Sequence, residues 1–257
     1  MKVFKHNLGD FEEIEILTLA DWHLGDPHSD IKQIYAWLDY VKSKPNVFVI
    51  LNGDLMDCAT RHSIGDCYSA TLSPMEQLKQ CAALFGDIKD RILFVDGGNH
   101  EERIYRTDGL DVSAMLCAQL GLECYAADGA ILFVRVGKQT KHKHRERPVC
   151  YTVFVQHGAG GGRKEGGKIQ RLSDLAAICD CDIYIHSHTH LPAIFKQAYI
   201  RVDTSNSTIA TVTKLFVNTS SALDYGGYGQ RLGFKPAAKD TPIITLCGTH
   251  KEMSATL

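Results

Sequence analysis

Short apolar runs of strand length alternate with segments of helical periodicity along most of this chain. The runs are rich in β-branched residues, and each ends abruptly in a polar cluster that contains Gly, Asp, Asn or His. Five such runs are residues 14–20, 47–51, 92–95, 151–155 and 183–185. Strand, polar loop and helix in repeated order indicate an α/β layered fold.

Four of the segments between these runs predict helices. Residues 30–41 place several aliphatic side chains on one helical face. Ser73 and Glu76, with a proline between them at the first helical position, form a capping signal. This signal predicts a helix that begins there and ends near residue 87. The remaining candidates are residues 111–120 and 169–178.

The last part of the chain changes character and becomes rich in strands. Residues 199–202, 214–217 and 243–246 are the candidates there. Together with the earlier runs they predict two mixed β-sheets packed as a sandwich and flanked by helices. There is no internal repeat and no low-complexity linker, so we expect a single domain over residues 1–257.

The composition mainly excludes certain classes of partner and of protein. The 257 residues carry a formal net charge of -2, so no global field favours nucleic acid or a membrane as partner. The first 15 residues hold no apolar signal-peptide core, and no run approaches about 18 apolar residues. The nine scattered cysteines do not resemble a disulfide framework. We therefore expect a cytoplasmic protein without a membrane partner, and the sequence leaves its oligomeric state open.

The polar clusters that follow the apolar runs contain carboxylate, imidazole and amide side chains. These are the ligand types that Mn, Fe and Zn accept at mixed nitrogen and oxygen sites. In α/β folds, loops after strand ends converge on one crevice. If the backbone is extended there, Asp21 with His23, and His188 with His190, point to the same side. The five clusters are residues 21–23, 53–57, 98–101, 156–158 and 186–190.

The order D-x-H, GDxxD, GNHE, H-G and H-x-H resembles the calcineurin-like metallophosphoesterase superfamily, over residues 21–190. The resemblance implies a four-layer fold and hydrolysis of a phosphate ester by water activated between two divalent ions. Manganese is the first candidate for both ions, with iron, zinc or nickel as alternatives. The ligands that it implies are Asp21, His23 and His190 for one ion, Asn99, His157 and His188 for the other, and Asp54 as the bridge.

The same resemblance implies roles for two further residues. His100 would protonate the leaving oxygen or steady the transition state from outside the metal coordination shell. Asp57 matches the acidic residue that orients this histidine in some members of the superfamily.

The chain departs from the pattern of protein Ser/Thr phosphatases, which carry an arginine after GDxxD and another before GNHE. Cys58 and Gly97 stand at these places. Because the arginine clamp for a phosphomonoester dianion is missing there, we expect a phosphodiester substrate, with a nucleotide or nucleic acid as the first candidate. A phosphomonoesterase and a non-catalytic metal-binding scaffold of the same fold are the alternatives. Arg103 could bind the substrate from outside the expected places.

Two segments have an unusual composition, and each allows two interpretations. Residues 138–147 are basic and lie between two apolar runs, so they form either a solvated hairpin tip or a nucleic-acid patch. Residues 158–168 hold six glycines. They form either a surface loop or an active-site loop that brings Arg163, Lys164 and Lys168 to the substrate.

Overall fold

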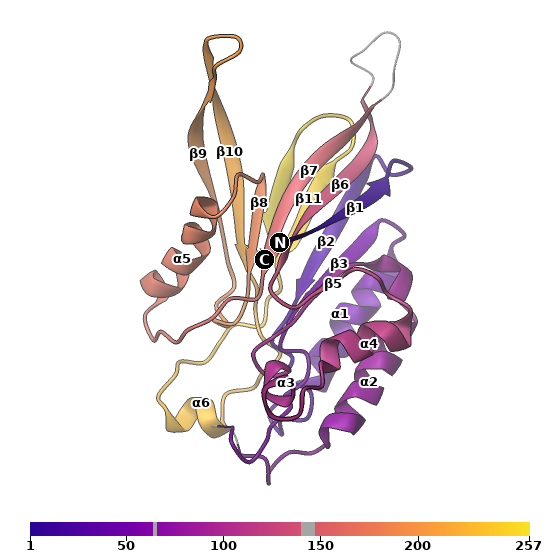
Figure 1. Ribbon diagram of the computed structural model, residues 1–257, viewed down its shortest axis with the longest axis vertical. Coiled ribbons are helices and arrows are strands. Elements are labelled where there is room, and N and C mark those ends of the chain that lie inside the picture. Colours follow the sequence, from indigo (N-terminus) through magenta and orange to yellow (C-terminus); the bar gives the residue numbers. More distant parts are fainter. Residues whose placement is uncertain (64–65, 140–146) are drawn as a thin grey trace.

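Two six-stranded mixed sheets face each other in the computed structural model, which describes residues 1–63, 66–139 and 147–257 (Figure 1). The first sheet has the order β1 (Lys2–Leu8), β6 (Ala130–Gln139), β7 (Arg147–Gln156), β8 (Ile183–His186), β10 (Thr208–Asn218) and β9 (Ala193–Asp203). The second has the order β12 (Met253–Thr256), β11 (Ile243–Cys247), β2 (Glu13–Leu19), β3 (Val47–Asn52), β4 (Ile92–Asp96) and β5 (Tyr125–Ala126). The sandwich prediction is confirmed.

The second sheet is apolar on both faces because helices cover the side that the first sheet leaves free. Along β2, Ile16 faces the first sheet, whereas Leu17 faces the helices. Ile50 of β3 meets the same inter-sheet core as Val153 of β7 and Ile185 of β8, and all three are fully buried. This double burial explains why the strands are continuous apolar runs and do not alternate.

Helices form the two outer layers. The outer face of the second sheet is covered by α1 (Ile31–Ser43), α2 (Pro74–Gly86) and α4 (Val112–Leu120). On the other side, α5 (Glu165–Asp174) packs Leu172 against Phe154 and Tyr184 of the first sheet. Figure 1 shows α5 separated from the other three helices by the sheets.

Local signals set most helix ends. Ser73 accepts a hydrogen bond from the backbone of Glu76, whose side chain accepts one from the backbone of Ser73, so the predicted capping box is present. The side chain of Asp111 caps α4 by accepting the backbone N–H of Ala114 at 2.9 Å, and the helix ends at Gly121 with a φ of 72°. The helix predicted over residues 169–178 instead begins at Glu165, inside the glycine-rich segment, and continues as a 3-10 turn at Leu175–Ala177.

Two short helices, α3 (Glu102–Asp108) and α6 (Gly227–Arg231), lie at one end of the molecule, beyond the sheets (Figure 1). The parallel strands of the second sheet run towards this end, which places the loops after them there. The architecture therefore gathers the polar clusters of the sequence at one edge of the sandwich.

Most of the basic segment, residues 140–146, lies outside the described residues. The flanking strands β6 and β7 pair antiparallel, with Gln139 opposite Arg147, so the segment connects the two strands of a hairpin. All nine cysteines fall within the described residues and are free. In the described ranges, no helix has both the length and the apolar character needed to cross a bilayer.

Candidate metal centre

The candidate ligands follow the carboxyl ends of strands from both sheets. The loops after β2, β3 and β4 of the second sheet carry Asp21, Asp54 and Asn99. The loops after β7 and β8 of the first sheet carry His157 and the pair His188 and His190. Because the two sheets are packed face to face, these five loops meet, and the side chains form groups whose ligand atoms lie within 4.8 Å of one another.

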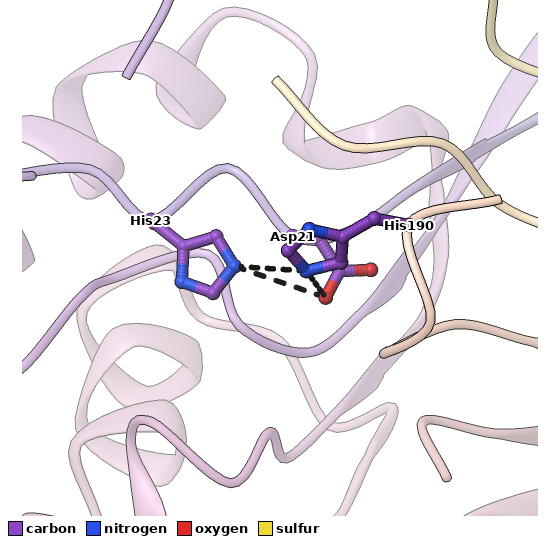
Figure 2. Close-up of side chains that lie close together, drawn as sticks. All are labelled: Asp21, His23 and His190. Carbon is purple, nitrogen blue, oxygen red and sulfur yellow. Dashed lines mark hydrogen bonds and ion pairs between the residues drawn. The ribbon is translucent and has the colours of Figure 1, made fainter. Parts of the chain in front are cut away.

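The first group consists of Asp21, His23 and His190 (Figure 2). The Nε2 atoms of the two histidines are 3.3 Å apart, and Nε2 of His190 lies 3.1 Å from Oδ1 of Asp21. That Oδ1 atom is buried and accepts no hydrogen bond from any described residue. A buried carboxylate oxygen without a donor, next to two converging imidazole nitrogens, fits a divalent cation.

The second group consists of Asp54, His157 and His188, with Asn99 beside it. Nε2 of His157 lies 3.3 Å from Oδ2 of Asp54 and 3.3 Å from Oδ1 of Asn99. Nδ1 of His157 donates to the backbone carbonyl of Asn52 at 2.6 Å, which leaves Nε2 as the ring nitrogen for a ligand. This donor set also fits a divalent cation.

Asp54 lies between the two groups. Its Oδ1 accepts the backbone N–H of His100 at 2.8 Å, and its Oδ2 lies 3.8 Å from Nε2 of His100. Asp54, His23 and His100 form a third group of close ligand atoms. The Asp54 carboxylate therefore lies close to a histidine of each candidate cation site, His157 of one and His23 of the other.

His100, Asp57 and Arg103 form a hydrogen-bonded chain at the edge of these groups. Nδ1 of His100 lies 3.0 Å from Oδ1 of Asp57, and Nη2 of Arg103 lies 2.8 Å from Nε2 of His100. Arg103 also donates to the backbone carbonyl of Asp57 at 3.1 Å. A guanidinium can only donate, so Nε2 of His100 accepts and the ring is the neutral Nδ1–H tautomer.

Burial and neighbouring charges shift the pKa values of the imidazoles in opposite directions. Burial, and then the nearby His100, hold the pKa of His23 well below its usual value. Burial and His157 lower the pKa of His188 to about 4. Burial also acts against protonation of His157, but the Asp54 carboxylate outweighs it and raises that pKa to about 10.

The pKa of His100 is raised, because the Asp54 and Asp57 carboxylates outweigh the opposing effect of burial. This direction disagrees with the hydrogen bond from Arg103, which requires an unprotonated Nε2. The raised direction holds with the Arg103 guanidinium in place, which itself lowers the pKa of His100, so departure of the guanidinium would raise this pKa further. His100 can therefore become protonated when the guanidinium leaves it.

The backbone at the ligands differs from the extended conformation expected from the sequence. The φ angles of Asp21, His23 and Asp54 are 52°, 46° and 51°, and those of His188 and His190 are 64° and 52°. All five lie in the left-handed region. Asp21 and His23 do converge in one ligand group, but a sharply turned loop brings them together and not the alternation of an extended strand. His188 and His190 belong to different ligand groups.

Two buried acidic residues to which the sequence analysis assigned no role, Asp96 and Glu101, hold the ligands in place. Asp96 accepts the backbone N–H of His157 at 2.7 Å and that of Gly129 at 2.9 Å. Glu101 accepts the backbone N–H groups of Asp54 and Met56 at 3.0 and 2.9 Å. Asp96 is the last residue of an apolar strand, and that position is a signal that could have indicated its role.

A cavity of about 470 Å³ opens over these groups. Of the residues expected to bind substrate, Arg103 and Arg163 line it, as does Lys168, whose Nζ donates to the carbonyl of Thr189 at 2.7 Å. Lys164 precedes the first turn of α5 and is not among the described residues that line the cavity. The opposite wall comes from residues 223–238, which no motif indicated.

The sequence family of calcineurin-like phosphoesterases matches residues 22–192, about two-thirds of the chain. The chain belongs to this family. Calcineurin-like phosphoesterases typically depend on divalent metal ions, and the Asp and His groups of this member are candidate ligands for them. No curated protein sequence matches the chain.

Solved structures with similarity to this calcineurin-like phosphoesterase share little sequence with it. Vacuolar protein sorting 29 of Cryptosporidium parvum is 12% identical, with 95% of this chain and 97% of that chain covered and a TM-score of 0.46. Zinc-complexed Vps29 of Entamoeba histolytica is 13% identical, with coverages of 95% and 97% and a TM-score of 0.42. A predicted phosphoesterase of Streptococcus pneumoniae is 12% identical, with coverages of 95% and 88% and a TM-score of 0.37.

Proposed function

We propose that this chain hydrolyses phosphodiesters with two divalent cations. Asp21, His23 and His190 would hold one cation. Asn99, His157 and His188 would hold the other, with Asp54 between them. The observation that carries the proposal is the convergence of these side chains, from five separate loops, below one cavity.

The charge of the cavity supports a role for cations. Five carboxylates and four Lys or Arg side chains line it, so its own charges do not attract an anionic phosphoester. Divalent cations at the ligand groups would give the cavity a net positive charge, which attracts a phosphoester. Manganese suits the mixed carboxylate, imidazole and amide ligands best, and iron, zinc or nickel are alternatives.

When bound, two divalent cations make a water molecule acidic enough to attack near pH 7 and offset the charge of the phosphoryl oxygens. The chain's own residues supply orientation and proton transfer. Asn52 and Asp96 fix the ring and the backbone of His157. His100 faces the cavity, and its ring is held through Nδ1 by Asp57, so its Nε2 could pass a proton to the leaving oxygen.

The positions of the arginines favour a diester. A phosphomonoester carries close to two negative charges near neutral pH, whereas a diester carries one. Cys58, which stands where monoester phosphatases have an arginine, is completely buried. Of the described residues that could compensate, Arg103, Arg163 and Lys168 line the cavity, whereas Arg61 and Arg106 do not. Lys168 already donates to the carbonyl of Thr189, and Arg103 is the arginine that is hydrogen-bonded to His100. One arginine beside His100 suits the single charge of a diester better than a dianion.

The test compares bis-p-nitrophenyl phosphate with p-nitrophenyl phosphate at the same Mn(II) concentration and pH. We expect the higher kcat/KM for the diester. A clear preference for the monoester would overturn the diesterase assignment and leave the metal site untouched. If neither ester is hydrolysed while elemental analysis finds the ions bound, the chain is a metal-binding scaffold and not an enzyme.

A further inference from the structure

The wall of the cavity opposite the metal centre is built by residues 223–238, beyond the residues that match the family. We propose that this wall, which we call the C-terminal wall, binds a planar aromatic group of a small phosphodiester of nucleotide size. The inference rests on the proposed diesterase function and adds the class of substrate. Three properties of the C-terminal wall support the inference: its position in the cavity, the contacts that hold it there, and the chemistry of its side chains.

The C-terminal wall is fixed to the metal centre at its start. The backbone N–H of Ala222 donates to the carbonyl of Asp21 at 3.1 Å, and the hydroxyl of Ser221 donates to the same oxygen at 3.0 Å. Asp224 donates its backbone N–H to the carbonyl of His28 at 2.8 Å. Its side chain also pairs with Lys239 at 2.5 Å. The wall therefore keeps a set distance from the candidate ligand Asp21.

An ion pair fixes the far end of the wall. Nζ of Lys235 lies 2.5 Å from a carboxylate oxygen of Glu165, the first residue of α5. This contact joins the C-terminal wall to the glycine-rich segment, which contributes Arg163 and three glycines to the cavity. A substrate held by the metal centre thus meets a preformed second surface, which lowers the entropy cost of orienting it.

The side chains of the C-terminal wall suit an aromatic ring with polar substituents. Two aromatic side chains, Tyr225 and Phe234, line the cavity, with Leu223 and Pro236 as further apolar residues of the same wall. Half of Tyr225 is exposed. Asp224 lines the same wall and can accept hydrogen bonds. Aromatic faces beside hydrogen-bonding groups favour a base-like ring over an alkyl chain, which cannot use the polar groups.

Charge pairing favours a small ligand over a nucleic-acid strand. Lys235 pairs with Glu165, and Lys239 pairs with both Asp30 and Asp224. Nucleic-acid grooves use basic side chains to follow successive phosphates, and these two lysines already face carboxylates. A cavity of about 470 Å³ is in the usual range for a small-molecule site.

The catalytic test uses two diesters with the same leaving group and the same charge, thymidine 5′-(p-nitrophenyl phosphate) and methyl p-nitrophenyl phosphate. We expect the wild-type chain with Mn(II) to favour the thymidine ester at least about tenfold in kcat/KM, from stacking of one base. Phe234→Ala and Tyr225→Ala should raise KM for the thymidine ester and leave the methyl ester unchanged. Tyr35→Ala is the matched control, because Tyr35 is also half exposed but does not line the cavity.

Equal rates for the two esters in the wild type, or equal losses for both in the variants, would overturn the aromatic subsite. A single-stranded oligothymidylate that is hydrolysed at least as efficiently as the thymidine ester would overturn the assignment to a small ligand.

A binding measurement separates failure of the subsite from failure of the proposed function. Calorimetry of the Mn(II)-loaded chain should show thymidine 5′-monophosphate binding about tenfold more tightly than methyl phosphate. Phe234→Ala should remove that difference. If neither ester is hydrolysed but this difference is found, the diesterase proposal fails and the aromatic subsite stands. If the two phosphates bind equally, the subsite is wrong whatever the catalytic result.

Discussion

The guanidinium of Arg103 donates a hydrogen bond to Nε2 of His100 at 2.8 Å. This nitrogen is the one that a proton donor to the leaving group would use, because Nδ1 is occupied by Asp57. Under the proposed role of His100 as proton donor, the arrangement in the structure is a resting one. Arg103 must leave His100 before the imidazole can hold a proton there, and the phosphoryl group is the anion to which it would move.

Arg103→Ala should therefore lower kcat/KM for a diester by about tenfold, mainly through a higher KM, because one charge-assisted hydrogen bond to the substrate is lost. Steady-state kinetics with bis-p-nitrophenyl phosphate measure the change. Arg106→Ala is the control, since Arg106 pairs with Glu102 on the exposed side of α3. Equal losses in the two variants would contradict the role of Arg103.

His100→Ala should lower kcat by about 10²–10⁴, the usual contribution of a positioned acid, with metal content close to that of the wild type. The defect should be smaller with p-nitrophenolate as leaving group, which departs without a proton. An equal loss for good and poor leaving groups would favour electrostatic stabilisation by His100. Loss of one bound ion would instead make His100 a ligand, as its position beside His23 and Asp54 allows.

Asp54→Ala should reduce the occupancy of both cation positions, because its carboxylate lies between the two ligand groups. Elemental analysis after dialysis in excess Mn(II) would show the change. We expect two ions per chain in the wild type and in Asp128→Ala, which alters an exposed carboxylate. One ion in the wild type would refute the two-metal mechanism.

Gly98→Ala should disturb the metal centre although Gly98 supplies no ligand atom itself, because its backbone packs against the candidate ligand Asp54. A Cβ atom at Gly98 would lie 2.1 Å from the backbone nitrogen of Asp54 and 2.2 Å from its Oδ1, so the loop must shift. We expect the free energy of unfolding to fall by about 1–3 kcal/mol, with loss of bound Mn(II). Gly86→Ala, where a Cβ meets open space, should leave metal content unchanged.

The sequence predicted the elements that local chemistry specifies. The five apolar runs became β2, β3, β4, β7 and β8, because their continuous apolar character reflects burial on both faces. The start of α2 followed from the reciprocal hydrogen bonds of Ser73 and Glu76. The candidate ligands could be grouped because each polar cluster directly follows a buried strand, and the loops after such strands meet at one sheet edge.

Features that depend on distant contacts were not predictable. β1 was missed because it is largely exposed, and its strand conformation depends on parallel pairing with β6, over a hundred residues away. The C-terminal wall has no periodicity, and it is placed by hydrogen bonds to Asp21 and His28 and by the ion pair with Glu165. The left-handed backbone at the ligands was unexpected because Asp and His rarely adopt it without tertiary constraint.

That backbone conformation means that the candidate metal centre lowers the stability of the fold. A left-handed φ costs a non-glycine residue about 1 kcal/mol, whereas glycine adopts it freely. His190, with φ 52° and its side chain 29% exposed, can be replaced with little loss of packing. In EDTA, His190→Gly should therefore melt at a higher temperature than the wild type. In Mn(II) the order should reverse, because only the wild type recovers the cost through metal binding. Selection for thermal stability alone would thus erode this centre.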